Sequence, residues 1–206
     1  MESRICLIRH GITEGNKNRL YYGFSDIPLA EEGIAELTRL AESGIYPYDE
    51  DADFYTTGLR RTEQTLSIIY GEKKHSHIGE MREINFGSFE MKSHDELKGS
   101  EDYKIWRSDR SGKLAPPGGE SLEGFSGRVL TGFEILKKQH RLKELSLRHS
   151  QKNALSVVVC HGGSISAVMN SIYPGGGENF YRWIPDPGHG YILTLRDGDF
   201  ADREMF

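Results

Sequence analysis

The chain of 206 residues is poor in cysteine, with only Cys6 and Cys160. Neither belongs to a CxxC pair or to a Cys/His ligand spacing, so the sequence offers no motif for a structural zinc ion. Both lie in short apolar stretches. We expect two small buried side chains in a reducing compartment, with a disulfide or a redox pair as the alternative.

Long hydrophobic runs and an excess of positive charge are lacking as well. No apolar stretch approaches the ~18–20 residues of a membrane span, and the N-terminal segment lacks the apolar core of a signal peptide. Lys and Arg number 26 against 31 Asp and Glu, a net charge of −5, which does not favour nucleic-acid or membrane binding. We therefore expect a cytoplasmic protein that acts on a small molecule. The sequence leaves open whether the chain forms a homodimer.

The length and the aromatic content favour one folded unit. At ~100–200 residues per domain, 206 residues predict a single domain over 1–206. The 9 Phe, 10 Tyr and 2 Trp supply a core, and a chain of this size buries ~70% of its surface without a metal or disulfide. The less regular segment 86–119 is expected to be an excursion from the sheet edge.

Hydrophobic patterning predicts an α/β fold. Short apolar runs indicate five strands, at 4–9, 53–56, 77–81, 155–160 and 190–195. Amphipathic segments indicate helices at 30–43, 59–70, 121–148 and 163–173. Buried runs that alternate with helices are typical of a three-layer α/β/α sandwich around a mostly parallel sheet.

Charged and polar residues follow four of the predicted strands. Ligands bind beyond the carboxyl ends of parallel strands, so these residues should share one edge of the sheet. They are Arg9 and His10, Arg60 and Arg61, Glu83, and His161. Arginines and histidines cannot satisfy one another's hydrogen bonds and need an anion, and the guanidinium fork matches phosphate oxygens.

This set of side chains suits phosphoryl transfer. A neutral imidazole is a nucleophile toward phosphorus, and neighbouring guanidiniums disfavour its protonation. A carboxylic acid beside it can protonate the leaving alkoxide. Glu83 is the natural candidate for that acid, with Glu80 and Glu90 as rivals.

Six segments in order resemble the histidine phosphatase superfamily, which has the phosphoglycerate-mutase-like fold. They are RHGITEGN at 9–16, the 23–33 stretch, LRRTEQT at 59–65, MREINFGSFE at 81–90, PGGES at 117–121 and HGG at 161–163. The LRRTEQT segment is similar to the family's LxRxxQT. Together these segments span almost the whole chain.

The resemblance implies a role for each matching residue. His10 would be the nucleophile that becomes phosphohistidine. Arg9 and Arg60 would clamp the phosphoryl oxygens, with Arg61 interpreted as a solvated helix residue. His161 would donate to the same phosphoryl group.

The remaining site residues follow from the same motifs. Glu83 would act as general acid and then as base for water. Thr13, Asn16 and Gly162 would contact the phosphate, although Thr13 can also be interpreted as a turn cap. No metal and no cofactor is implied, because Arg and His supply the positive charge.

The segments are most similar to the compact phosphatase branch, which includes α-ribazole phosphatases and broad-specificity phosphatases. We expect a phosphomonoester hydrolase for a small metabolite such as α-ribazole 5′-phosphate or a sugar phosphate. The alternatives are a cofactor-dependent phosphoglycerate mutase, which is usually longer, and a non-catalytic phospholigand-binding module.

The chain departs from the residues common in the family at Thr57, Met91 and Cys160. The other six histidines are interpreted as surface or loop residues: His75, His77, His94, His140, His149 and His189.

Overall fold

A six-stranded sheet forms the centre of the computed structural model, which describes residues 2–150, 152–175 and 179–206. The strands in spatial order are β4 (His75–His77), β3 (Asp53–Thr56), β6 (Leu155–Cys160), β1 (Glu2–Arg9), β7 (Gly190–Arg196) and β8 (Asp199–Met205). The first four run parallel, and β7 is antiparallel to both of its neighbours. The prediction of a mostly parallel sheet within an α/β fold is confirmed.

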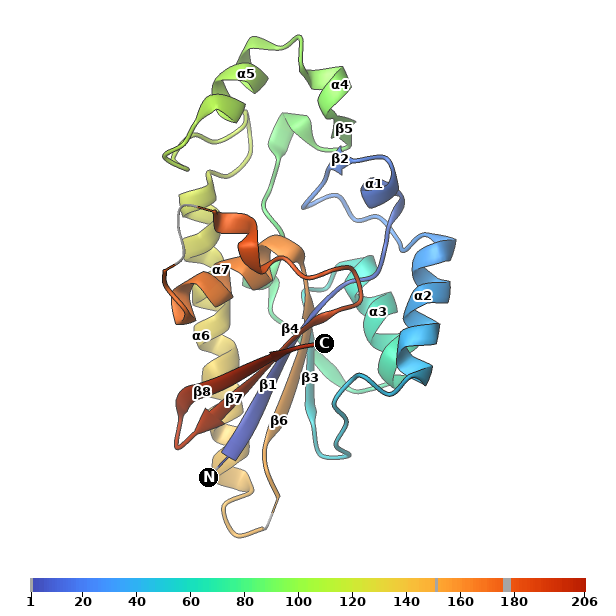
Figure 1. The fold of residues 1–206 in the computed structure, drawn as a ribbon, viewed down its shortest axis with the longest axis vertical. Coiled ribbons are helices and arrows are strands. Elements are labelled where there is room, and N and C mark those ends of the chain that lie inside the picture. The colour runs from blue at the N-terminus through green and yellow to red at the C-terminus, as the bar shows by residue number, and fades with distance from the viewer. Residues whose placement is uncertain (1, 151, 176–178) are drawn as a thin grey trace.

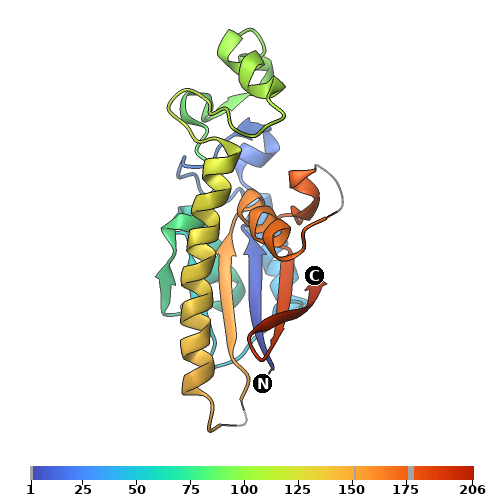
Figure 2. The ribbon, with the colours of Figure 1, turned by 90° about the vertical axis from the view of Figure 1, so that its left-hand side faces the viewer.

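Helices cover both faces of this sheet (Figures 1 and 2). They are α2 (Glu31–Glu42) and α3 (Arg60–Tyr70) on one face, and α6 (Leu122–Ser146) and α7 (Gly162–Ile172) on the other. Side chains alternate across a strand, so Cys6 and Ile8 of β1 pack toward α2 and α3, whereas Ile5 and Leu7 pack toward α6 and α7. Every residue of β6 is buried because the strand lies at the middle of the sheet.

Two strands differ from the sequence-based expectation. The strand expected at 77–81 is β4, which ends at His77, and Gly79–Met81 form a 3-10 turn. The sequence does not predict the last strand, β8, because most of its residues are polar and all but Phe200 are exposed. It folds back on β7 through Asp197 and Gly198, both at positive φ, as two-residue hairpins require.

The segment 86–119 extends beyond the carboxyl ends of the parallel strands (green, Figure 1). It contains β5 (Lys92–Ser93), α4 (His94–Leu97) and α5 (Glu101–Ser108). Its aromatic cluster includes Phe89, Tyr103 and Trp106. The strand β2 (Leu20–Tyr21), which follows the short helix α1 (Glu14–Lys17), pairs with β5 and ties the excursion to the N-terminal region.

Both cysteines and His140 are buried in the interior of the protein. Cys6 and Cys160 are buried free thiols, and burial raises the pKa of each. His140, expected at the surface, is buried between the hydroxyls of Ser3 and Ser156, and burial lowers its pKa. In the part of the chain that the structure describes, none of the helices has the length and apolarity to cross a bilayer.

Candidate active site

The register of two central strands brings two histidines together. Arg9 of β1 lies opposite Cys160 of β6, so the residues that follow them, His10 and His161, emerge side by side. Their ring centroids are 5.2 Å apart, and both side chains are buried. The two histidines that the sequence placed at separate strand ends therefore form one site.

The surroundings of His10 fix its protonation state. Its Nδ1 lies 2.7 Å from the carbonyl oxygen of Gly11, which can only accept, so Nδ1 carries the proton and Nε2 carries the lone pair. Burial, followed by the charge of Arg61, holds the pKa of His10 well below its usual range. The imidazole is therefore neutral near pH 7, with Nε2 as its nucleophilic atom.

His161 is positioned by a residue outside the expected site. The hydroxyl of Thr57 lies 2.9 Å from Nε2 of His161, and burial and Arg61 lower the pKa of this histidine too. Its Nδ1 is buried without a hydrogen-bond partner among the described residues. Thr57, noted in the sequence as a departure from the family, thus orients the second histidine.

The arginine near both histidines is Arg61 and not Arg60. Arg61 is fully buried, and its guanidinium donates to the carbonyls of Ser25 at 2.8 Å and Gly23 at 2.7 Å. Arg60 is exposed, and its backbone N–H donates to Asp26. Adjacent helical residues point about 100° apart, and the buried face of α3 includes position 61 but excludes 60. The prediction that Arg60 lies in the site and Arg61 in solvent is wrong, because Arg61 is the buried residue and Arg60 is the exposed one.

Arg9 completes a group of buried donors. Its Nη1 donates to Pro185 at 2.7 Å, and its Nε has no partner among the described residues. The Nε of Arg61 is unpartnered in the same way. A Cβ at Gly162 would lie 3.3 Å from Arg9 Nε, so glycine at this position lets α7 approach the guanidinium. Unpaired buried donors are costly unless a ligand satisfies them, and these donors suit an anion.

Glu83 lies at the N-terminus of α7. Its Oε2 accepts from the backbone N–H of Gly163 at 2.9 Å, and its Oε1 accepts from Ile84 at 3.0 Å. A Cβ at Gly163 would lie 2.3 Å from Oε1, so only glycine allows this approach. The second glycine of the HGG segment is thus explained by the position of the carboxylate.

The two rival acids have other places in the structure. Glu90 accepts hydrogen bonds from the backbone of Gly23, Phe24 and Ser25 and holds that loop together. Glu80 is exposed. Neither lines the cavity beside His10, whereas Glu83 does.

Thr13 and Asn16 build the first turn after β1. Thr13 is the N-cap of α1, forms a capping box with Asn16, and donates to the hydroxyl of Tyr22 at 2.8 Å. Thr13 is buried, and it does not line the cavity as Asn16 does. The interpretation of Thr13 as a turn cap matches the geometry, and Asn16 is the residue of this pair that lines the cavity.

A cavity of about 650 Å³ separates the strand ends from the excursion. Arg9, His10, Asn16, Glu83 and Gly162 line its inner end. Its outer part combines aromatic rings with charged side chains and includes Tyr21, Phe86, Trp106, Arg107, Asp109, Arg110 and Tyr181. The cavity thus joins an anion-binding end to a part lined by aromatic rings and charged side chains.

Comparison with known proteins agrees with these motifs. The family model described as "Histidine phosphatase superfamily (branch 1)" matches residues 5–205. The chain belongs to this superfamily. The predicted resemblance is confirmed, and the segment LRRTEQT can be aligned with the superfamily's LxRxxQT. Counted from Leu59, that pattern places its arginine at position 61, so the sequence did contain the signal for the correct residue.

Relatives of this superfamily member carry two kinds of name. A phosphoglycerate mutase from Schizosaccharomyces pombe is 28% identical over 98% of this chain and 94% of its own length. A 2,3-bisphosphoglycerate-dependent phosphoglycerate mutase from Parvibaculum lavamentivorans is 32% identical over 82% of this chain and 79% of its own length. The crystal structure of the alpha-ribazole phosphatase from Shigella flexneri has the same fold, with a TM-score of 0.72 at 24% identity over 98% and 94% of the two chains. Because the match covers most of both mutases, chain length does not separate mutases from phosphatases here.

Proposed function

We propose that this superfamily member hydrolyses phosphomonoesters through a phosphohistidine at His10. The observation that carries the proposal is a neutral, tautomer-fixed imidazole beside buried donors that lack partners. His10 supplies the nucleophile, while Arg9, Arg61 and His161 supply the hydrogen bonds that a phosphoryl group needs.

The reaction has two steps. Nε2 of His10 attacks phosphorus, the ester P–O bond breaks, and protonated Glu83 gives its proton to the leaving oxygen. Water then attacks the phosphohistidine, Glu83 takes a proton from it, and the N–P bond breaks to release phosphate. Oriented donors around the transferring group carry its charge in both steps, so no metal or cofactor enters the mechanism.

The outer part of the cavity favours a substrate with a bulky apolar alcohol. Tyr21, Phe86, Trp106 and Tyr181 give it an aromatic lining, and such surfaces bind flat or apolar groups. We therefore place α-ribazole 5′-phosphate ahead of small sugar phosphates as the substrate. The fold shared with the alpha-ribazole phosphatase of S. flexneri is compatible with this choice.

Phosphoglycerate mutase is the second candidate. It is supported by the names of the curated relatives and by Arg107 and Arg110, which line the cavity and could pair with the carboxylate of a phosphoglycerate. A non-catalytic binding module is less well supported, because both His10 and Glu83 are present and line one cavity.

Two assays on the purified chain separate these functions. We expect phosphate release from p-nitrophenyl phosphate and α-ribazole 5′-phosphate, without interconversion of 2- and 3-phosphoglycerate. Mutase turnover without hydrolysis would reject the proposal in favour of the second candidate, and no turnover of any ester would favour a binding module.

The role of Glu83 is tested by the leaving group. Glu83→Gln should lower kcat/KM for alkyl phosphates by about 10²–10⁴-fold, but lower it far less for p-nitrophenyl phosphate, whose leaving group needs no proton. Equal losses for both substrates would assign the acid to another residue.

A further inference from the structure

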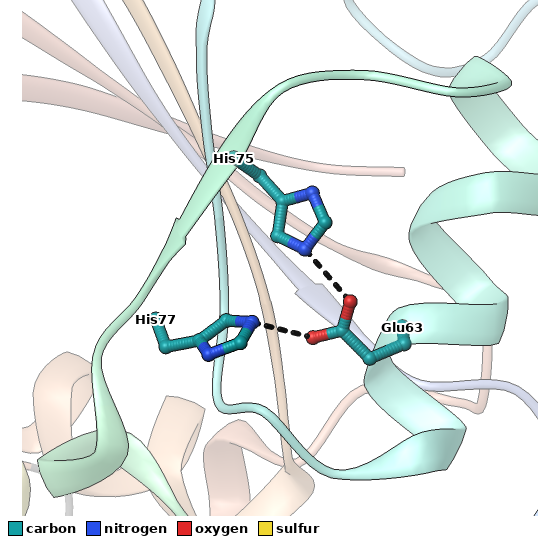
Figure 3. Close-up of side chains that lie close together, drawn as sticks. All are labelled: Glu63, His75 and His77. Atoms are coloured by element: carbon teal, nitrogen blue, oxygen red, sulfur yellow. Dashed lines mark hydrogen bonds and ion pairs between the residues drawn. The ribbon is translucent and has the colours of Figure 1, made fainter.

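A second group of polar side chains lies outside the cavity, at the edge strand of the sheet (Figure 3). Glu63 belongs to the first turn of α3, and His75 and His77 belong to β4. Residues two apart on a strand share a face, so both imidazoles point toward the carboxylate of Glu63. None of the three takes part in the mechanism proposed above.

The distances suit a shared ion. Nε2 of His75 lies 2.7 Å from Oε2 of Glu63, and Nε2 of His77 lies 3.3 Å from Oε1. One ligand atom from each residue lies within 4.8 Å of the other two. Zinc binds imidazole nitrogens and carboxylate oxygens at about 2.0–2.2 Å, so small side-chain rotations would bring all three into one coordination sphere.

The hydrogen bonds of His75 leave one place for a cation between it and Glu63. Its Nδ1 lies 2.8 Å from the carbonyl oxygen of Lys73, an acceptor, so Nδ1 carries a proton. Its Nε2 therefore presents a lone pair to the carboxylate unless a second proton or a metal ion lies between them. A second proton would pair His75 with Glu63 alone, whereas a divalent ion in its place would bind His77 as well.

The outer contacts resemble those of protein metal sites. Ligating histidines usually donate their other N–H to a carbonyl, and ligating carboxylates are themselves hydrogen-bonded. Here Lys73 accepts from His75, and the hydroxyl of Thr56 donates to Glu63. The side chain of His77 is 60% exposed, which leaves a path for an ion and room for water ligands.

We propose that Glu63, His75 and His77 bind one divalent transition-metal ion, with zinc as the best match. Two imidazoles and a carboxylate are a ligand set that zinc accepts. The sequence lacks the cysteine-based spacings of a zinc motif, and its pattern predicts surface or loop positions for His75 and His77. A helix and a strand supply the ligands, so no single motif reveals them.

The site would act on stability and not on chemistry. Thr56, which holds Glu63, is followed by Thr57, which holds His161. A bound ion would therefore link α3 to β4, beside Thr56, without touching the reacting atoms. An ion that binds only the folded state raises the melting temperature.

The test is a zinc titration of the chelator-treated full chain by calorimetry, with thermal unfolding measured in parallel. We expect one zinc site whose affinity falls at least tenfold in His77→Ala and in Glu63→Gln, together with loss of the zinc-dependent rise in Tm. His149→Ala is the matched control, because His149 is exposed, and it should bind zinc as the unmodified chain does. Unchanged affinity in His77→Ala, or no binding at all, would overturn the proposal.

A further variant excludes binding at the paired active-site histidines. His10→Ala should keep the zinc affinity and the Tm rise, because His10 lies outside the cluster. Loss of zinc binding in His10→Ala, with binding retained in His77→Ala, would assign the ion to the active site and refute the inference. Neither result depends on whether the chain is a hydrolase or a mutase.

Discussion

Two adjacent arginines offer a sharp test of the site, because the structure buries one and exposes the other. Arg61 donates to the carbonyls of Gly23 and Ser25 and lies over the ring of Tyr22, 5.1 Å from its centroid. Arg60 is exposed at the start of the same helix. Arg61→Ala and Arg60→Ala should therefore have very different consequences.

The magnitudes follow from these contacts. Removal of a preorganised donor to the transferring group costs about 10²–10³-fold in kcat, and we expect this loss in Arg61→Ala. A hydrogen bond from a charged group contributes about 1.5–3 kcal/mol. Two are lost with Arg61, but a buried charge is lost with them, so we expect a fall of about 2–3 kcal/mol in the free energy of unfolding. Arg60→Ala should stay within about 0.5 kcal/mol, as exposed substitutions do.

The assay is turnover of p-nitrophenyl phosphate, with urea unfolding to separate activity from stability. Arg61→Lys is a useful intermediate, because lysine keeps the charge but lacks the fork that reaches two carbonyls, and its activity should lie between those of the unmodified chain and Arg61→Ala. A loss in Arg60→Ala equal to that in Arg61→Ala would refute the placement of the phosphate clamp.

Four further predictions follow from the contacts of the site. Thr57→Ala should lower kcat about tenfold, because His161 loses its hydrogen bond, while Thr57→Ser should keep most activity; equal losses would exclude a role for the hydroxyl. Gly163→Ala should displace the Glu83 carboxylate and slow alkyl phosphates more than p-nitrophenyl phosphate; an unchanged ratio of the two rates would contradict this. Burial lowers the pKa of the three buried histidines, whereas hydrogen bonds outweigh burial and raise that of His75. Well below pH 6.5, His75 is protonated in both states, so the unfolded chain binds up to three more protons through the buried histidines. The free energy of unfolding should then fall by up to about 4.1 kcal/mol for each pH unit of acidification; urea midpoints that stay flat from pH 6.5 to 5.5 would disagree. Finally, EDTA should leave the initial rate of ester hydrolysis unchanged, and a large loss would show a metal in the mechanism.

Much of the scaffold could be predicted from local patterns. The strand β6 is a buried run rich in valine, and α2 has one apolar face and is followed by Gly44 in the left-handed region. By contrast, β8 has polar, exposed residues and is held by pairing with β7. Its position depends on a neighbour and not on its own pattern.

The positions of site residues that directly follow strands could be predicted from the sequence. Positions that depend on the rotation of a helix or on contacts with distant segments were harder to predict. His10, Glu83 and His161 lie together because strand order brings their segments to one edge. The LxRxxQT pattern selects Arg61 over Arg60, but helical periodicity alone does not, since a shift of one residue at the start of α3 turns a side chain by about 100°. Thr57 contacts a histidine 104 residues away, which no local signal encodes.

The central claim is that His10 carries the phosphoryl group during turnover, and Glu83→Gln provides the direct test. With p-nitrophenyl phosphate the first step needs no acid, whereas hydrolysis of the phosphohistidine needs Glu83 as base, so the intermediate should accumulate. We predict that alkaline quenching and peptide mass spectrometry find the phosphoryl group on His10, and that adding His10→Ala abolishes it. No phosphorylated peptide, or the same phosphorylation without His10, would contradict the account.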